Sequence, residues 1–391
     1  MLIDMLELLP EKIYVKLEEN FRKELFDKCI VKAGTVTRLA KMTKVSRQWF
    51  NKWRWGWQRT PFDAFTFLLN YNGISIHAVW DNIEEFGLQG QNRGLKLPRF
   101  FNITEDFIWF IGVRHGDKAE SKTQIGLCNS DTDILKKFCE VLFLFGIPSE
   151  TLSFYVYVKD EEKRKILKTF LKNLCKAEEK KIKFYYRSDR EMYVIVQLHN
   201  ALFHKLVYKI EENLPSLLSS SSNFKAAYIR GFADAEGCVD HHGYIIITQK
   251  LSKLGKKNIQ LVMNLLEKLC IKSHTRTDGL KLRLIINRQS LKSYEHLIGF
   301  CSKRKMNDLK IIREIYENKY DKRNIENEIT ELAQKPITRR EIVLALKSNY
   351  DKTGLVIRKL AKEGKINVIN KRPLTIISLK EVPHDSLVNH P

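Results

Sequence analysis

The spacing of hydrophobic residues between positions 104 and 320 repeats approximately once. In each copy a short apolar segment ends in small residues and an acid, DFIWFIGVRHGDK at 106–118 and AAYIRGFADAEGCV at 226–239. Alternating apolar runs, which predict β-strands, come next, followed by apolar residues three and four positions apart, which predict an amphipathic helix. Each copy closes with further alternating runs and helical segments. The pattern therefore predicts an α+β fold of two similar halves, each of about 100 residues in the order αββαββα and related by a pseudo-two-fold axis.

Small residues mark one face of the helix that opens each half. Gly112 and Gly116 are four residues apart in the first helix, and Gly231 and Ala235 have the same spacing in the second. Residues four apart lie on one face of a helix, and two helix backbones can approach closely where that face has no bulky side chains. The sequence therefore predicts that these two helices pack side by side.

An acid follows each small-residue face, Asp117 in the first half and Glu236 in the second. Side-by-side helices would bring the two carboxylates together, where they repel each other unless a cation lies between them. Carboxylate oxygens favour a hard divalent ion such as Mg²⁺, and metal ions can activate water and relieve charge during phosphodiester hydrolysis. For one copy, ordinary helix packing with an exposed terminal acid is the simpler interpretation. Two copies in the same context favour the metal site.

Breaks in composition separate the two halves from each other and from the chain ends. A Gly- and Gln-rich stretch precedes the first half, and a Ser-rich stretch precedes the second. A highly charged stretch, either a solvated helix or a tether, follows the second half. Such compositions are typical of connections. We therefore expect an N-terminal domain at 1–86, a linker at 87–103, the first half at 104–214, a connector at 215–223, the second half at 224–320, and a tether with a C-terminal domain at 321–391.

The N-terminal domain contains a pattern typical of a helix-turn-helix. A short helix with one apolar face precedes Thr43, and Ser46 is suited to cap a second helix. An ordinary helical hairpin is the alternative. We interpret the nearby tryptophans as core and anchor residues, namely Trp49, Trp53, Trp55 and Trp57. The second helix would carry side chains of the kinds that bind base edges and phosphates, namely Arg47, Gln48, Asn51 and Lys52.

The C-terminal domain resembles a winged helix between positions 337 and 379. Helical spacing comes first, and two β-like runs about a basic tip follow. The same pattern could instead serve protein contact. The residues expected to bind DNA are Arg358 and Lys359 on the recognition helix, with Lys371 and Arg372 at the tip of the wing.

The charge balance favours a polyanionic partner. The chain has 68 Lys and Arg residues against 46 Asp and Glu residues, which gives a net charge of +22. Such an excess attracts nucleic acid, although a solvated lysine surface is the alternative. The seven cysteines show no metal-ligand spacing, and the N-terminus shows no signal-peptide pattern. We expect reduced thiols and a cytoplasmic location, in a prokaryote or an organelle.

Several segments resemble the LAGLIDADG homing endonucleases. YIRGFADAEGCV is similar to the family motif, with Glu236 at its final acidic position, and FIGVRHGDK resembles the motif of the first half, with Asp117 at that position. The passages IGLCNSDTDILKKF, IIITQKLSKLGKKNIQLV and LIINRQSLKSYEHLIGFCSKRKMNDLKII resemble segments that follow the motifs. The resemblance extends over about 104–320. It implies a saddle of β-strands in the DNA major groove, with the paired helices at its centre.

The resemblance also implies metal-dependent cleavage of both DNA strands, leaving short 3′ overhangs. Asp117 and Glu236 would bind the metal, Mg²⁺ or another hard divalent cation. Four further positions would lie near the catalytic water or the scissile phosphate, with a solvated surface as the alternative; they are Gln249, Asn129, Lys303 and Lys305.

The first motif departs from the family pattern at three positions. Lys118 replaces the usual glycine, Arg114 stands where an apolar residue is usual, and His115 stands where the first acid of the motif would fall. Lys118 could occupy the space of a cation or contact DNA, as we expect of Lys250 in the second half. We interpret His115 as exposed or facing DNA rather than as a general base. Nicking, weak activity and loss of activity all stay open.

These observations predict a monomeric, site-specific endonuclease for double-stranded DNA, with a DNA-binding domain at each end. The alternative is a transcriptional regulator that retains the scaffold and binds DNA without cleaving it. The presence of both acids favours the endonuclease. A second role on intron RNA stays open, and the chain shows no intein signature, so we expect a free-standing protein.

Overall fold

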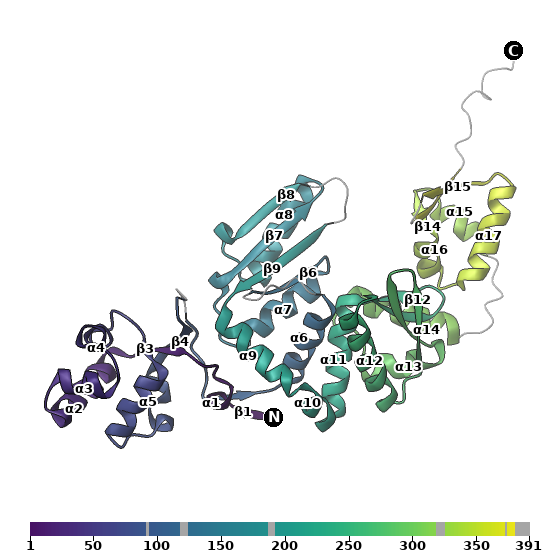
Figure 1. Cartoon of the computed structure of the whole chain (residues 1–391). Coiled ribbons are helices and arrows are strands. Elements are labelled where there is room, and N and C mark those ends of the chain that lie inside the picture. The colour runs from purple at the N-terminus through teal and green to yellow at the C-terminus, as the bar shows by residue number, and fades with distance from the viewer. Residues whose placement is uncertain (91–93, 118–123, 187–191, 318–324, 372–373, 380–391) are drawn as a thin grey trace, which may run out of the picture. The chain divides into compact units, whose positions relative to one another are not determined.

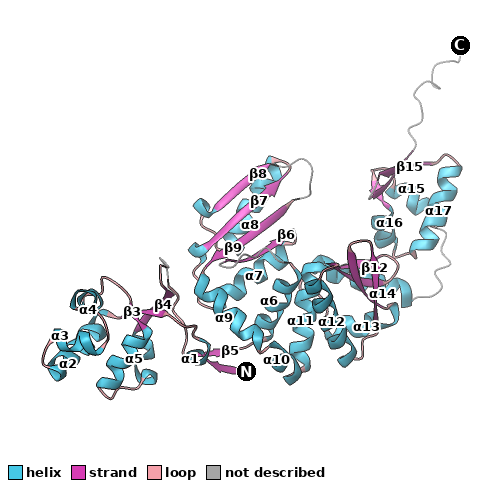
Figure 2. Cartoon of the chain, viewed as in Figure 1, coloured by secondary structure: helices cyan, strands magenta, loops and turns pink. Residues whose placement is uncertain are grey.

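The computed structural model describes residues 1–90, 94–117, 124–186, 192–317, 325–371 and 374–379. It divides into two compact units, Met1–Gly231 and Phe232–Pro391, and each is described by itself. Helices and sheets occur together in both units (Figure 1, Figure 2), which confirms the α+β class. Among the described residues, no helix combines the length and hydrophobicity that a membrane crossing requires.

The first unit begins with helices and a small antiparallel sheet of strand order β3-β2-β4. Alternate residues of the central strand, Ile13, Val15 and Leu17, are buried, as expected for a strand with one covered face. The elements in order are β1 Leu2–Asp4, α1 Met5–Leu8, β2 Ile13–Leu17, α2 Glu19–Ala33, α3 Val36–Met42, α4 Arg47–Arg54, β3 Thr60–Pro61, α5 Phe62–Tyr71, the 3₁₀ helix Ile76–Asn82 and β4 Ile83–Leu88.

The first half of the repeat forms a four-stranded sheet of order β6-β9-β7-β8. Strands β7 and β8 pair in parallel, and the other pairs are antiparallel. Parallel neighbours need a crossover connection, and helix α8 provides it, so the described residues of this half include a crossover helix that the predicted αββαββα order lacks. The elements are β5 Phe100–Asn102, α6 Glu105–Gly116, β6 Gln124–Asn129, α7 Thr132–Leu144, β7 Leu152–Val158, α8 Glu161–Leu174, β8 Ile182–Tyr186, β9 Tyr193–His199, α9 Ala201–Glu212 and α10 Leu214–Ser220.

The second half follows the predicted order. Its antiparallel sheet has the order β10-β11-β13-β12, with buried residues at alternate positions of β11. The boundary between the units falls inside the helix that opens this half. The elements are α11 Ser222–Glu236, β10 Gly237–Asp240, β11 Tyr244–Lys250, α12 Lys253–Lys268, β12 Ser273–Asp278, β13 Lys281–Ile286, α13 Leu291–Leu297 and α14 Lys303–Glu317.

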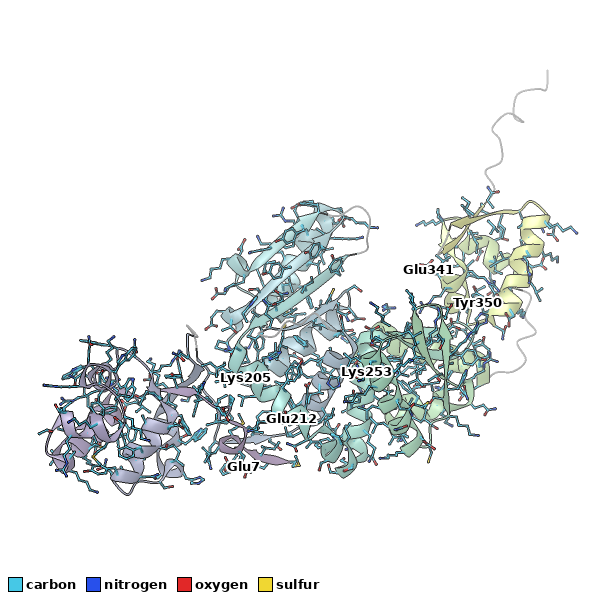
Figure 3. The ribbon with its side chains drawn as sticks, viewed as in Figure 1. Glu7, Lys205, Glu212, Lys253, Glu341 and Tyr350 are labelled. Atoms are coloured by element: carbon cyan, nitrogen blue, oxygen red, sulfur yellow. The ribbon has the colours of Figure 1, made fainter. Side chains whose placement is uncertain are left out.

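The C-terminal part of the second unit contains helices and a three-stranded antiparallel sheet of order β14-β16-β15. A core of apolar side chains, including Ile342, Ile357 and Ile377, holds them together. Helix α16 begins with a capping box between Thr338 and Glu341, which is labelled in Figure 3. The elements are α15 Glu326–Leu332, β14 Ile337–Thr338, α16 Arg339–Leu346, α17 Tyr350–Lys362, β15 Ile366–Lys371 and β16 Leu374–Leu379.

The segments expected to be connections contain more regular structure than their composition suggested. The Ser-rich connector overlaps α10, because Leu214, Leu217 and Leu218 are buried on one side of that helix while its serines face outward. Near the other connection, Phe86 and Leu95 form a β-bridge. Burial of a few apolar residues therefore orders segments that are rich in Ser, Gly and Gln.

Candidate functional site

Helix α6 and the beginning of α11, both in the first unit, lie side by side in parallel. At their N-terminal ends Asn223 Nδ2 donates a hydrogen bond to Glu105 Oε1 at 2.9 Å. Further along, a Cβ atom at Gly231 would overlap the carbonyl oxygen of Trp109 and lie 3.0 Å from the backbone nitrogen of Val113. The close backbone approach predicted from the small residues is therefore confirmed at Gly231.

The Gly231→Val variant should test how far the fold depends on this contact. The added side chain would meet the backbone of α6, which cannot move aside as a flexible side chain can. We expect the free energy of unfolding to fall by about 3 kcal/mol, at the upper end of the usual cost of overpacking, as measured by urea denaturation. Ser222→Val, at the exposed first residue of the same helix, should change it by less than about 1 kcal/mol. Equal stability of Gly231→Val and wild type would contradict the close contact.

The unusual residues of the first motif form a largely buried polar network. Arg114 is 2% exposed, and its Nη1 atom lies 2.5 Å from Glu211 Oε1 on α9. His115 Nε2 lies 3.4 Å from the same oxygen, and His115 Nδ1 lies 2.8 Å from the hydroxyl oxygen of Tyr228 on α11. Burial raises the pKa of the Tyr228 hydroxyl, which therefore stays protonated. Arg114 and His115 thus connect α6 to α9 and α11.

His115 was interpreted as exposed or facing DNA, and the first of these alternatives was wrong. Its side chain is only 20% exposed, because it is enclosed between Glu211 and Tyr228. Glu211 is 97 positions away from Arg114 in the sequence. No local pattern could therefore have identified the partner that makes this burial favourable.

Asp117 lies directly after α6, where its backbone N–H donates to the carbonyl oxygen of Val113 at 2.9 Å. Burial raises the pKa of its carboxyl group from 3.8 to about 6, while a hydrogen bond from the backbone N–H of Cys128 on β6 acts in the opposite direction. A nearby cation would favour the ionised form of such a carboxyl group.

The raised pKa of Asp117 predicts a pH dependence of stability. In the unfolded chain this carboxyl group ionises near pH 3.8, whereas in the folded protein it holds its proton up to about pH 6. The folded state therefore binds more protons between these values, and the free energy of unfolding should fall as the pH rises from about 4 to 7. Over this range the free energy of unfolding of wild type should fall by at most about 3 kcal/mol relative to that of Asp117→Asn. The measurement is urea denaturation in EDTA. Parallel pH profiles for the two proteins would contradict the buried carboxyl group.

Glu236 is the last residue of α11, and contacts within the second unit fix the turn of helix before it. The carboxylate of Asp234 is fully buried and accepts hydrogen bonds from the backbone N–H of Cys301, at 3.1 Å to each oxygen. Lys305 Nζ donates to the carbonyl oxygens of Ala233 at 3.2 Å and Asp234 at 2.6 Å. A cation is favourable at the C-terminal end of a helix. The solvated-surface alternative is therefore wrong for Lys305, which is 7% exposed, whereas Lys303 is exposed.

Asn129 and Gln249 occupy similar places in the two sheets. Gln249 lies on the same face of β11 as the buried residues Ile245 and Ile247, near the end of the strand. Asn129 ends β6, and its Oδ1 atom accepts a hydrogen bond from the backbone N–H of Asp131 at 2.8 Å. Both side chains are partly buried and lie on the buried face of their sheet, so neither belongs to the open face.

The open face of the second sheet is basic. Thr248, Arg283 and Arg276 lie in register across β11, β13 and β12, and Lys250 is paired with Lys281 one step further along. Lys250 and Lys281 are exposed. Arg283 Nη2 lies 2.7 Å from Asp278 Oδ2 on the same face, so part of this charge is balanced locally. The remaining basic side chains are suited to contact phosphates.

The open face of the first sheet is aromatic instead. Tyr193, Tyr157 and Tyr185 lie in register across β9, β7 and β8, and their rings stack with centroids 4.4 and 5.1 Å apart. Lys183 lies 5.6 Å from the ring centroid of Tyr155 on the same face. Strands β6-β9-β7 of the first sheet and β11-β13-β12 of the second are both antiparallel. The side chains on the open face are aromatic in the first sheet and basic in the second.

The N-terminal part has the two helices predicted there, α3 and α4. Ser46 Oγ accepts a hydrogen bond from the backbone N–H of Trp49 at 3.3 Å, which caps α4 as expected. The residues predicted to bind DNA lie on α4, where Arg47 and Gln48 are exposed and Asn51 and Lys52 are partly buried.

Three of the four tryptophans do not belong to the core. Trp53 is buried, but Trp49, Trp55 and Trp57 are exposed, so their interpretation as core residues was wrong. Trp49 contacts Lys52, whose Nζ atom lies 4.4 Å from the ring centroid. A cavity of about 1040 Å³ opens beside α4 and is lined in part by Trp49, Trp53 and Lys44.

In the C-terminal part, Arg358 and Lys359 are exposed on α17. Lys359 Nζ lies 2.5 Å from Glu326 Oε1 on α15, so part of its charge is balanced locally. Lys371 belongs to β15, but its side chain lies outside the described residues, as do Arg372 and Lys118.

Comparison with known proteins finds a similarity within the second half. Residues 223–299, from α11 to the end of α13, match the family model described as LAGLIDADG-like domain. This segment is therefore similar to the LAGLIDADG-like domain. No match was found among curated proteins.

Solved structures of the homing endonuclease I-DmoI are similar to this chain at low identity. The complex with DNA and Mn has 15% identity and a TM-score of 0.33, and covers 50% of this chain and 97% of that chain. The complex with DNA and Ca has 14% identity and a TM-score of 0.33, and the match covers 50% of this chain and 88% of that chain. A structure of mesophilic variants of I-DmoI has 15% identity and a TM-score of 0.32, and the match covers 50% of this chain and 88% of that chain.

Proposed function

We propose that this protein is a homing-type endonuclease that cleaves double-stranded DNA with a divalent metal ion. The main supporting observation is the close contact of α6 and α11 at Gly231, within a chain whose residues 223–299 match the LAGLIDADG-like domain model. Each of these helices leads to an acid a few residues beyond the contact, Asp117 after Val113 and Glu236 after Gly231.

Asp117 and Glu236 are the residues that would hold the metal. Their carboxylate oxygens suit a hard cation such as Mg²⁺, and the raised pKa of Asp117 shows that its surroundings disfavour an uncompensated negative charge. A bound ion would supply charge relief at the phosphate and a more acidic water. In this proposal Gln249 and Asn129 orient water, and Lys303 contributes positive charge near the scissile phosphate.

Lys305 has a positioning role in this proposal. Its ammonium group is held by the carbonyl oxygens of Ala233 and Asp234, in the helical turn that leads to Glu236. Together with the bonds from Asp234 to the backbone of Cys301, this fixes the end of α11 against the start of α14. A side chain that projects from a backbone fixed in this way needs less ordering when it binds a cation.

The DNA would be held by phosphate contacts from several basic surfaces. The basic residues Arg276, Arg283 and Lys250 on the open face of the second sheet support this proposal, and the net charge of +22 strengthens long-range attraction. Helices α4 and α17 would extend the recognised site as parts of a helix-turn-helix and a winged helix. The protein would act as a monomer whose two halves each serve one DNA strand.

Cleavage of a randomised duplex library tests the proposal. The full chain is incubated with Mg²⁺ or with EDTA, and the DNA ends that form are sequenced. We expect sequence-enriched ends with 3′ overhangs in Mg²⁺ and none in EDTA. Specific retention of duplex DNA without new ends would contradict cleavage and identify a DNA-binding regulator. Absence of both would reject the proposal as a whole.

A further inference from the structure

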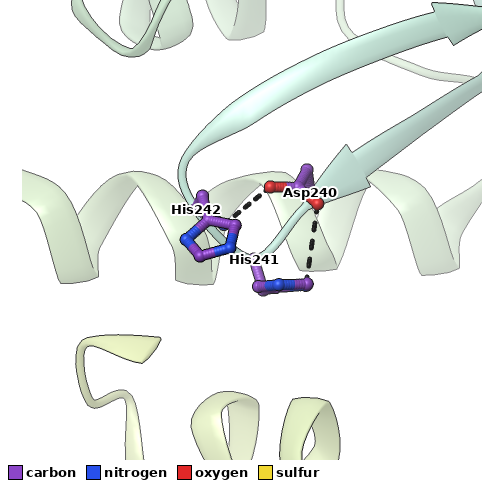
Figure 4. Close-up of side chains that lie close together, drawn as sticks. All are labelled: Asp240, His241 and His242. Carbon is purple, nitrogen blue, oxygen red and sulfur yellow. Dashed lines mark hydrogen bonds and ion pairs between the residues drawn. The ribbon is translucent and has the colours of Figure 1, made fainter. Parts of the chain in front are cut away.

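The turn between β10 and β11 brings together three side chains that can bind a metal ion. Asp240, His241 and His242 each offer one ligand atom, and these atoms lie within 4.8 Å of one another (Figure 4). His241 Nδ1 lies 3.6 Å from Asp240 Oδ1. All three residues are partly buried, and the proposed cleavage chemistry uses none of them.

Hydrogen bonds hold this turn in one conformation. The backbone N–H of His242 donates to Asp240 Oδ2 at 2.9 Å, and the N–H of Gly243 donates to the carbonyl oxygen of Asp240 at 3.0 Å. Arg288 Nη2 donates to the carbonyl oxygen of His242 at 2.5 Å, and the hydroxyl of Tyr316 donates to that of His241 at 3.0 Å. The two histidine side chains therefore project from a turn whose backbone is held by hydrogen bonds.

Helix α17 orients the rings and adds a fourth candidate ligand. The ring of His241 stacks on Tyr350, which is labelled in Figure 3, with centroids 3.6 Å apart. The next residue, Asp351, places Oδ1 4.0 Å from His242 Nδ1. Asp351 therefore lies beside His242, next to the three clustered residues.

We propose that Asp240, His241 and His242 bind a divalent first-row transition metal ion, for which Zn²⁺ is the probe, with Asp351 as the fourth ligand. Imidazole nitrogen with carboxylate oxygen is a ligand set that such ions accept. Neighbouring ligands of a tetrahedral zinc ion with bonds of 2.0–2.1 Å are about 3.4 Å apart. The 3.6 Å between Asp240 and His241 is close to this value, so small side-chain rotations suffice.

Nearby arginines set the expected strength of binding. Arg288 contacts the turn, Arg339 lies 3.6 Å from the ring centroid of Tyr350, and Arg340 lies 2.6 Å from Asp308 Oδ2. These guanidinium groups disfavour a dication, but they equally disfavour protonated imidazole, and the neutral ring is the form that binds metal. We therefore expect binding in the micromolar rather than the nanomolar range.

Isothermal titration of the full, EDTA-treated chain with Zn²⁺ tests the site. His241→Phe keeps a ring against Tyr350 but removes the ligand nitrogen, and His242→Ala removes the second. The matched control is His274→Ala, since His274 belongs to β12 and its Nδ1 contacts Asn287 Oδ1 at 3.0 Å. Because thiolates also bind zinc, Cys238→Ser is titrated as well, and Co²⁺ absorption spectra show whether sulfur is a ligand.

We expect wild type, His274→Ala and Cys238→Ser alike to bind one equivalent of Zn²⁺ that depends on the two histidines, besides any ion held by Asp117 and Glu236. Co²⁺ should show no sulfur charge-transfer band. His241→Phe and His242→Ala should each bind at least about tenfold more weakly, while their unfolding temperatures without metal stay close to that of wild type. Unchanged affinity in both histidine variants would overturn the proposal, as would a loss of binding in Cys238→Ser. The outcome can be told apart from that of the cleavage proposal, because Glu236→Gln should affect only an ion held by Asp117 and Glu236 and should keep the Zn²⁺ that depends on His241 and His242.

Discussion

The Glu236→Gln variant is expected to lose cleavage of duplex DNA while keeping its fold and its affinity for DNA. Glutamine has nearly the same shape as glutamate but lacks the negative charge that a divalent cation requires. Because a metal contributes several kcal/mol to stabilising charge in the transition state, the cleavage rate should fall at least about a hundredfold. The measurement is single-turnover cleavage of the selected target in Mg²⁺, together with binding of the same duplex.

Glu267→Gln serves as the matched control. Glu267 is an exposed residue near the end of α12 in the same unit, so the variant makes the same chemical change away from the proposed site. Its cleavage rate should equal that of wild type. A Glu236→Gln variant that cleaves as fast as Glu267→Gln would show that Glu236 is not a metal-binding catalytic residue.

The largest change in stability is expected from removal of Glu211. Arg114 is 2% exposed and lies 2.5 Å from the Glu211 carboxylate, so Glu211→Ala leaves a guanidinium group buried without its carboxylate. Breaking a buried ion pair from one side typically costs 3–5 kcal/mol, and we expect the free energy of unfolding to fall by about 3–5 kcal/mol in urea denaturation.

The neighbouring residue provides the control for this prediction. Glu212 ends α9, is exposed, and is labelled in Figure 3. Glu212→Ala should change the free energy of unfolding by no more than about 0.5 kcal/mol. The double replacement of Arg114 by Met and Glu211 by Leu should recover much of the lost stability, because both buried charges are then removed. A Glu211→Ala variant as stable as Glu212→Ala would contradict the buried ion pair.

Features that depend on neighbouring residues were predictable from the sequence. The helices α6, α7, α11 and α12 follow apolar spacing, and Ser46 caps α4 because its hydroxyl reaches an N–H three residues away. The close contact at Gly231 was also predictable, because only a small side chain lets two backbones approach.

Features that depend on distant partners were not predictable. Strand β8 pairs in parallel with β7 because helix α8 connects them by a crossover. The amphipathic pattern of α8 alone does not specify that crossover. Trp49, Trp55 and Trp57 are large and apolar, yet the core of the N-terminal part is filled by other side chains and leaves them exposed.

The sequence by itself determined the repeat of two α+β halves, the small-residue faces of their opening helices and the acids that follow, because local periodicity and residue size express these features directly. Only the tertiary structure decided what surrounds them. It showed Arg114 paired with Glu211 and Lys305 held by the end of α11, and it brought His241 against Tyr350. These contacts join residues more than 70 positions apart. The cost of burying a charge or fixing a ring is balanced only by a partner that folding brings into place.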